Sequence, residues 1–209
     1  MPQLIAMVIV VVGAMIYMFQ TFGGTGDKIE GIAQKTSVIT EINNIKNGLK
    51  LAARSEHIES AANANTEAVT TLEGLAEFAY FPEQINEQLD VDGQVDTATI
   101  YQAISFGADN SLQITMVNDV QGAIPGIFVD LSNGTLAANA GFLEAQIAND
   151  LDSIATIDRT ATSANAGALP ANATGIAART PAANGDGGTN ADGMFIIYFN
   201  DFGTTEVVR

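Results

Sequence analysis

"DKIEGIAQKTSVITEINNIKNGLKLAARSEHIES" (residues 27–60) is the stretch that decides the fold of this chain. Apolar or small residues recur in it at steps of three and four, which places them along one side of an α-helix. The Asn and Lys residues lie mostly off this side. The stretch therefore predicts an amphipathic helix that rests on the remainder of the chain through the stripe Ile29, Ile32, Ala33, Thr36, Ile39, Ile42, Ile45, Leu49 and Ala52.

The segment before this helix, residues 1–26, carries no charged side chain. As a helix with a rise of about 1.5 Å per residue, Met1 to Phe22 would be roughly 33 Å long, which is enough to cross a bilayer core. No Lys or Arg precedes Lys28 and no A-x-A-like site ends the run, so the pattern disfavours a secretory signal. A membrane anchor and a helix that packs with copies of itself both stay open. The residues expected to make these contacts are Met1, Leu4, Ile5, Met7, Val8, Val11, Val12, Met15, Ile16 and Phe19.

Four glycines interrupt or follow the apolar run: Gly13, Gly23, Gly24 and Gly26. Each glycine weakens a helix by about 1 kcal/mol relative to alanine. An anchor has no need of such a weak point, whereas a helix that leaves a bilayer and repacks against its own copies could use one. We therefore expect a softened joint here, between an apolar segment (1–26) and the amphipathic half of one long helix (27–60).

The remaining residues, 61–209, predict an acidic α+β head with a small, mostly antiparallel sheet. Alternating or apolar runs predict strands at 112–118, 123–131 and 194–202, the last of them central in the sheet. Pro125 favours an edge position or a bulge for the second strand, and residues 204–209 are a candidate further strand. A helix between these strands is predicted to bury one face, formed by Phe142, Leu143, Ile147, Leu151 and Ile154.

Composition narrows the possible functions. The chain has 24 acidic and 8 basic residues, a net charge of −16, and this balance disfavours nucleic-acid binding. The charge is uneven, because five of the eight basic residues lie within the first 54 positions. There is no cysteine, which excludes disulfides and thiolate chemistry.

Few residues suggest chemistry. His57 is the only histidine, so a histidine pair for a metal is impossible, and we expect His57 to be a surface residue. Two acidic loops, at 90–96 and 184–192, have oxygen ligands of the kind calcium prefers, but Asp-Gly and Asn-Gly are also ordinary turn sequences. We therefore expect no catalytic, cofactor-binding or metal site. The loop residues concerned are Asp90, Asp92, Asp96, Asn184, Asp186, Asn190 and Asp192.

An uncharged apolar start, weakening glycines, an amphipathic second half and a sheet-bearing head together resemble a type IV pilin. The run "GIFVDLSNGTLAANAGFLEAQIAND" (126–150) is similar to the head segment of the type IVb branch. The resemblance implies that a short basic leader is removed just before Met1 and that the new amine of Met1 is methylated. Members usually carry Glu at the fifth position, where this chain has Ile5, and often a carboxy-terminal cysteine pair, which this chain lacks.

The sequence therefore predicts a structural, non-enzymatic subunit of a cell-surface filament. Its partners are expected to be the cytoplasmic membrane before assembly and identical copies afterwards, with no cofactor. The alternative is a single-pass, membrane-anchored surface binding protein that stays monomeric.

Overall fold

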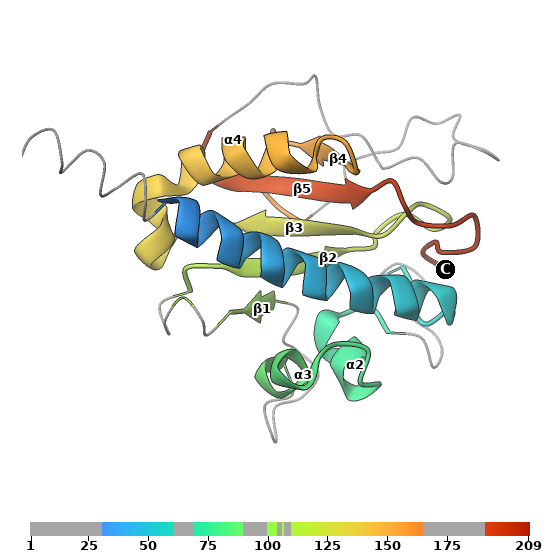
Figure 1. Cartoon of the computed structure of the whole chain (residues 1–209). Helices are drawn as coiled ribbons and strands as arrows, with labels where there is room; N and C mark the ends of the chain where they lie inside the picture. The colour runs from blue at the N-terminus through green and yellow to red at the C-terminus, as the bar shows by residue number, and fades with distance from the viewer. Residues whose placement is uncertain (1–30, 61–68, 90–99, 104–105, 107–109, 165–190) are drawn as a thin grey trace, which may run out of the picture.

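A five-stranded antiparallel sheet with helices packed on it forms the body of the protein (Figure 1). The computed structural model describes residues 31–60, 69–89, 100–103, 106, 110–164 and 191–209. The strand order is β1-β2-β3-β5-β4, and every neighbouring pair is antiparallel. This arrangement confirms the α+β class and the antiparallel sheet. The strands are β1 Ile100–Gln102, β2 Gln113–Val117, β3 Gly126–Asp130, β4 Ala155–Asp158 and β5 Met194–Phe199.

The N-terminal helix is described over residues 31–54 and lies along one face of the sheet (Figure 1). Ile42, Ile45 and Leu49 are completely buried beneath it, as its apolar stripe predicts, and so is Val38, which was not included in the predicted stripe. Burying side chains of this size contributes about 1.5–3 kcal/mol each. The helix ends at residue 54, and Glu56 then takes a left-handed backbone conformation, with φ at 62°.

The beginning of the predicted stripe is not covered by the body. Ile32 is 57% exposed, and Ala33 and Thr36 are exposed as well. Gly31 at the start of the described helix is buried, so packing begins there, and Ile32, Ala33 and Thr36 are exposed because they lie on the side of the helix that the body does not cover.

Shorter helices complete the described body. Thr71 caps the first of them, because its hydroxyl accepts a hydrogen bond from the Gly74 backbone N–H at 3.1 Å. Pro82 stands directly before the second, where its missing N–H costs nothing. These helices are α2 Leu72–Glu77, α3 Glu83–Leu89, the 3₁₀ helix η2 Gly134–Asn139 and α4 Ala140–Leu151.

The strands predicted at 123–131 and 194–202 are present as β3 and β5, and the position of β3 in the sheet differs from the expected one. β5 is an interior strand with buried side chains on both faces, as its continuous apolar run predicts. β3 is the middle strand of the sheet, so the edge position suggested by Pro125 is wrong. Pro125 immediately precedes the first residue of β3, where its missing N–H removes no bond from the ladder.

The helix predicted between the strands is α4, but its buried face is narrower than expected. Leu143, Ile147 and Leu151 are buried, whereas Phe142 is 45% and Ile154 is 42% exposed. Ile154 lies beyond the end of the helix, in the turn that leads into β4. Residues 204–209 form turns rather than a strand, so that expectation is also wrong.

Candidate functional site: the N-terminal helix and its carboxy-terminal clasp

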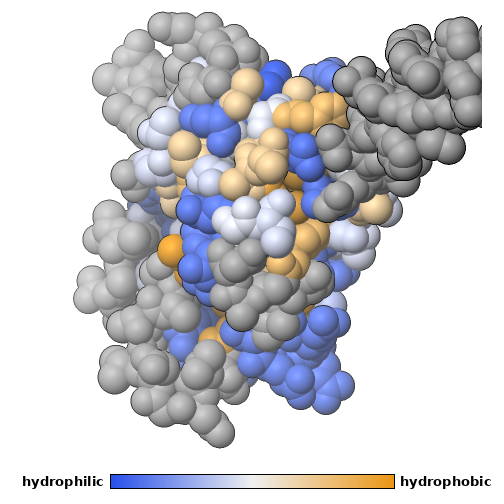
Figure 2. Space-filling view, turned by 90° about the vertical axis from the view of Figure 1, so that its left-hand side faces the viewer, coloured by the Kyte–Doolittle hydropathy of each residue, from blue (hydrophilic) through white to orange (hydrophobic). Residues whose placement is uncertain are grey.

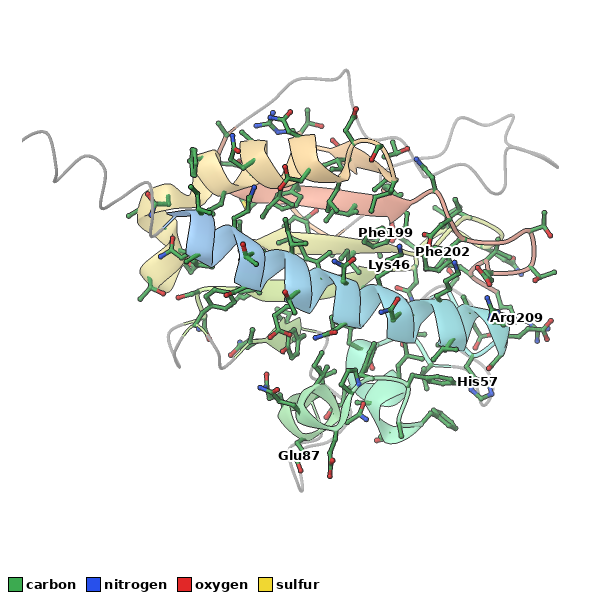
Figure 3. The ribbon with its side chains drawn as sticks, viewed as in Figure 1. Lys46, His57, Glu87, Phe199, Phe202 and Arg209 are labelled. Carbon is green, nitrogen blue, oxygen red and sulfur yellow. The ribbon has the colours of Figure 1, made fainter. Side chains whose placement is uncertain are left out.

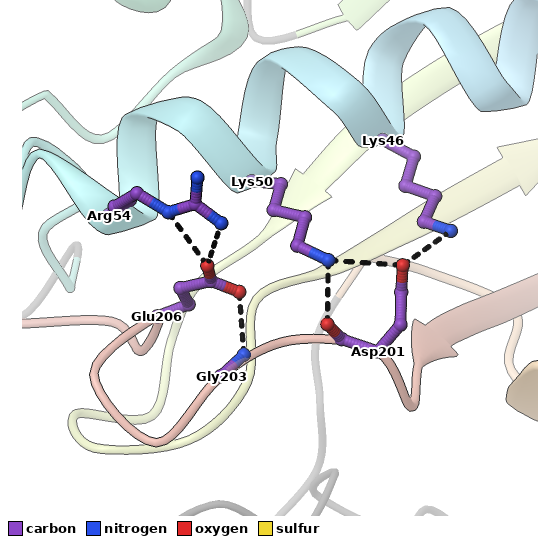
Figure 4. A network of polar contacts seen from close by, with 6 residues as sticks. All are labelled: Lys46, Lys50, Arg54, Asp201, Gly203 and Glu206. Atoms are coloured by element: carbon purple, nitrogen blue, oxygen red, sulfur yellow. Dashed lines mark hydrogen bonds and ion pairs between the residues drawn. The ribbon is translucent and has the colours of Figure 1, made fainter.

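Three basic side chains form a row on one flank of the N-terminal helix. Lys46, Lys50 and Arg54 follow one another every four residues, a spacing that places them on the same side of a helix. The segment that follows β5, residues 200–209, runs beside this flank and carries two carboxylates (Figure 4). We call residues 201–209 and the three basic side chains the carboxy-terminal clasp.

Asp201 joins the first two cations of the row. Its Oδ2 atom lies 2.9 Å from Lys46 Nζ and 3.1 Å from Lys50 Nζ. Lys50 Nζ also donates to the backbone carbonyl oxygen of Asp201, at 2.7 Å. One residue at the exit of β5 is thereby held to two successive turns of the helix.

Glu206 joins the third cation and is the more buried of the two acids. Arg54 donates to Glu206 Oε1 through Nε at 3.0 Å and through Nη2 at 2.6 Å. The other oxygen, Oε2, accepts from the Gly203 backbone N–H at 2.5 Å. The Glu206 side chain is only 6% exposed, whereas Arg54 is 60% exposed. The carboxylate therefore depends on these donors in place of water.

Aromatic rings lie beneath the lysines. Lys46 Nζ is 4.8 Å from the centre of the Phe199 ring, and Lys50 Nζ is 5.9 Å from that of Phe202. The two rings stack on each other with centres 6.5 Å apart. Figure 3 shows Lys46 with both rings at the point where β5 leaves the sheet. A cation over an aromatic face is attracted by the ring quadrupole, so these rings support the lysines in place.

Backbone pairing closes the clasp at its far end. The Arg209 N–H donates to the Ile58 carbonyl at 2.9 Å, and the Ser60 N–H donates to the Arg209 carbonyl at 2.8 Å. The Val208 N–H donates to the Ala123 carbonyl at 2.9 Å. Arg209 also forms an ion pair with Glu56. The last residues of the sequence therefore connect the end of the N-terminal helix to the turn between β2 and β3.

The ion pairs change the acidity of both carboxyl groups. Burial by itself would raise the pKa of Asp201, but the hydrogen bonds and charges of Lys46 and Lys50 outweigh it and hold this pKa below its usual value. The same balance applies to Glu206, where burial is outweighed by the Gly203 N–H and by Arg54, so its pKa is also lowered. Both groups stay ionised well into the acidic range.

A separate contact holds the N-terminal helix to the sheet near its middle. Tyr101 of β1 donates from its hydroxyl to Glu41 Oε2 on the helix, at 3.2 Å. Burial raises the pKa of the Tyr101 hydroxyl above its usual range, and the Glu41 charge raises it further. The phenol therefore stays protonated and remains a donor to the helix.

The only histidine is half-buried and belongs to an aromatic cluster. Its Nδ1 atom lies 2.6 Å from the Tyr80 hydroxyl oxygen, and its ring centre is 4.9 Å from that of Phe78. Figure 3 places His57 just beyond the end of the helix, on the side of α2. The expected surface position is thus only partly right, because Tyr80 and Phe78 cover much of the ring.

At the opposite end of the helix, apolar side chains meet the solvent. Phe142 packs against the backbone of Gly31, since a Cβ atom on Gly31 would stand 3.2 Å from the Phe142 ring. Ile32 beside it is 57% exposed. Figure 2 faces this end of the molecule and shows apolar surface among hydrophilic residues.

The outer side of the helix carries no charge between these two ends. Its exposed residues are Ile32, Ala33, Thr36, Ser37, Thr40, Asn47 and Leu51. The hydroxyls of Thr36, Ser37 and Thr40 donate to backbone carbonyls one turn earlier, at 3.0, 3.3 and 2.9 Å. Burial of these side chains would therefore leave no hydroxyl hydrogen without an acceptor.

Each Lys and Arg of the described residues is used in an ion pair within the chain. The two pairs outside the clasp are those of Lys35 with Asp150, at 2.7 Å, and of Arg159 with the fully buried Glu144, also at 2.7 Å. Exposed carboxylates such as Glu83, Glu87 and Asp152 belong to none of these ion pairs.

Most of the residues predicted for assembly lie outside the described residues. This holds for Met1 to Phe19 and for Gly13, Gly23, Gly24 and Gly26. No helix within the described ranges is long and apolar enough to cross a membrane.

The acidic loops are described at one residue only. Asp192 accepts a hydrogen bond from the Met194 N–H at 3.0 Å, which is ordinary turn geometry, and the other loop residues named above lie outside the described part. Within the described part, no group of three or more His, Asp or Glu side chains could hold a metal ion.

The excess of basic residues at the beginning of the chain is visible in the sequence, but the clasp was not predicted from it. The signal was the four-residue spacing of Lys46, Lys50 and Arg54 together with the acids of the last nine residues. In comparisons with known proteins, no family model, no curated protein and no solved structure matches this chain.

Proposed function

We propose that this chain is a structural subunit of a cell-surface filament similar to a type IV pilus. In this proposal residues 1–26 rest in the cytoplasmic membrane before assembly and pack with identical copies in the filament afterwards. The observation that carries the proposal is the helix over residues 31–54. It follows the uncharged segment after residues 27–30, and its second half is fastened to an antiparallel sheet.

Two features of the described helix support contacts between copies. Ile32 on the helix and Phe142 on α4 are exposed near its first described turn. Its outer side has only uncharged exposed residues up to Leu51, although the whole chain has a net charge of −16. A surface without charge can be desolvated by another copy without the large cost of burying an unpaired ion.

Electron microscopy of material sheared from cells that express the chain tests the proposal. We expect thin filaments, with mass spectrometry identifying this chain as a component. Membrane fractions that contain the chain as a monomer, with no filaments at the surface, would instead favour the anchored binding protein.

A matched pair of variants tests whether the outer side of the helix is used. Asn47→Glu adds one charge at an exposed position and Asn47→Gln adds none, while both new residues favour a helix more than Asn does. We expect Asn47→Glu to reduce filament yield strongly and Asn47→Gln to leave it near normal, with equal melting temperatures. Equal yields from the two variants would exclude this side of the helix as a contact.

A further inference from the structure

The distribution of charge in the folded chain bears on how copies approach one another. All described cations are neutralised inside the chain, by Asp150, Asp201, Glu206, Glu144 and Glu56. Arg54 and Arg209 stay more than half exposed within their pairs, and Lys28 and Arg179 lie outside the described residues. The whole sequence nevertheless carries a net charge of −16.

The acids outside these ion pairs lie on separate parts of the body. Glu83 and Glu87 are exposed on α3, and Asp152 is exposed just after α4. Figure 3 shows Glu87 on the outer side of α3, directed away from the sheet. Because α3 and α4 lie on opposite sides of the N-terminal helix (Figure 1), exposed carboxylates outside the ion pairs are found on both of its sides.

The range of this repulsion depends on salt. The Debye length is about 30 Å at 0.01 M ionic strength and about 3 Å at 1 M. At low salt the negative bodies of neighbouring copies would repel one another across the whole width of a subunit, whereas at high salt they interact only at contact. Apolar and uncharged contacts are not weakened by salt in this way.

We propose that homotypic assembly of this chain is controlled by ionic strength, and that dissolved cations screen the excess of acidic over basic residues. The inference rests on the proposed filament function and adds its regulation. It specifies general screening by small cations rather than a built metal site.

Reassembly of subunits taken from native filaments tests the inference. Filaments are dispersed in mild detergent, the detergent is removed at a series of NaCl concentrations, and pelleted filament is measured and checked by electron microscopy. We expect the subunit concentration left in solution to fall by about tenfold or more between 0.01 M and 1 M NaCl. MgCl₂ at equal ionic strength should give a similar result. A much larger effect of Mg²⁺ would overturn screening in favour of specific bridging.

Two variants changed at the same three positions, but with different net charges, isolate the cause. Changing Glu83, Glu87 and Asp152 to Lys moves the net charge from −16 to −10, since each reversal adds two units, and changing them to Gln, Gln and Asn moves it to −13. All three positions are exposed, and Glu83 lies in the first turn of α3, where a positive charge opposes the helix dipole, so we expect only a small fall in the melting temperature of the Lys variant. The salt concentration for half-assembly should fall severalfold in the Lys variant and by less in the amide variant.

The two proposals fail differently. Cells that make no filaments from this chain would refute the filament function itself. Native filaments whose subunits reassemble equally well at 0.01 M and 1 M NaCl, or variants that show no ordered shift, would leave the function standing and refute its control by salt.

Discussion

Replacing Glu206 with Gln tests whether the carboxy-terminal clasp stabilises the fold. The change keeps the size of the side chain but removes the charge that accepts two N–H groups of Arg54 and the N–H of Gly203. A hydrogen bond to a charged group contributes about 1.5–3 kcal/mol when one partner is buried. Arg54 is 60% exposed and regains water when the pair is lost, so we take the lower part of this range.

We therefore expect Glu206→Gln to lower the free energy of unfolding by about 1.5–2 kcal/mol. In a chain of this size that corresponds to a fall of about 3–8 °C in Tm. Asp201→Asn is the matched control, because its carboxylate is 46% exposed and should contribute only about 0.5 kcal/mol. Urea unfolding of the full chain in non-ionic detergent, followed by near-UV circular dichroism of its four tyrosines, measures both variants.

The pH dependence of unfolding gives a second measurement of the same contact. The pKa values of Asp201 and Glu206 are lowered in the folded chain. Their contribution to the free energy of unfolding is therefore complete above the pKa values of the same carboxyls in the unfolded chain, about 4–4.5. This contribution is lost as the pH falls through the pKa values that the two carboxyls have in the folded chain. Glu206→Gln should make the loss of stability below pH ~4.5 less steep. A variant as stable as Asp201→Asn, with an unchanged acid slope, would refute this account of the clasp.

Three further predictions concern packing, the glycines and the acidic loops. Gly48→Ala should lower the free energy of unfolding in urea by about 3 kcal/mol, because the new Cβ atom would clash with the Phe81 ring. Asn47→Ala, one residue earlier at an exposed position, is the control and should be nearly neutral. Equal effects of the two changes would contradict the close approach of Phe81 to the helix backbone. Chelation with EDTA should leave the melting temperature of the chain unchanged, and a clear downward shift would reveal a metal site in the acidic loops. Replacing Gly23, Gly24 and Gly26 together with Ala adds about 3 kcal/mol of helix preference. Under the proposed function this variant should still insert into membranes but form fewer filaments, and a normal filament yield would exclude a hinge at these glycines.

The local parts of the fold could be predicted from the sequence. The stripe through Ile42, Ile45 and Leu49 and the continuous apolar run of β5 depend on neighbours within a few residues, and the structure confirms both. The shortest strands, β1 and β4, were missed, because three or four residues contain too little alternation to separate a strand from a turn. Pro125 was misjudged for a related reason: its effect depends on whether it precedes β3 or lies within it.

The clasp could not be predicted from local pattern, because its partners are far apart in the chain. Arg54 and Glu206 are separated by 152 positions, and a pattern of charges does not state which acid meets which base. The row of Lys46, Lys50 and Arg54 fits a solvated helix face equally well. Only the antiparallel order of the sheet, which brings the end of β5 beside the helix, selects Asp201 and Glu206.

The clasp also fixes the order in which the chain can complete its fold during synthesis. The N-terminal helix and β2 leave the ribosome early, but the partners of Lys46, Arg54 and Ile58 lie in residues 201–209, much later in the chain. Contacts of such long sequence separation form late and slow folding. Until residues 201–209 emerge, the basic flank of the helix remains open on a nascent chain. Ribosome-bound chains stopped before residue 200 should therefore be cleaved by protease near residues 55–60. Chains extended past residue 209 by enough residues to clear the exit tunnel should resist cleavage at the same place.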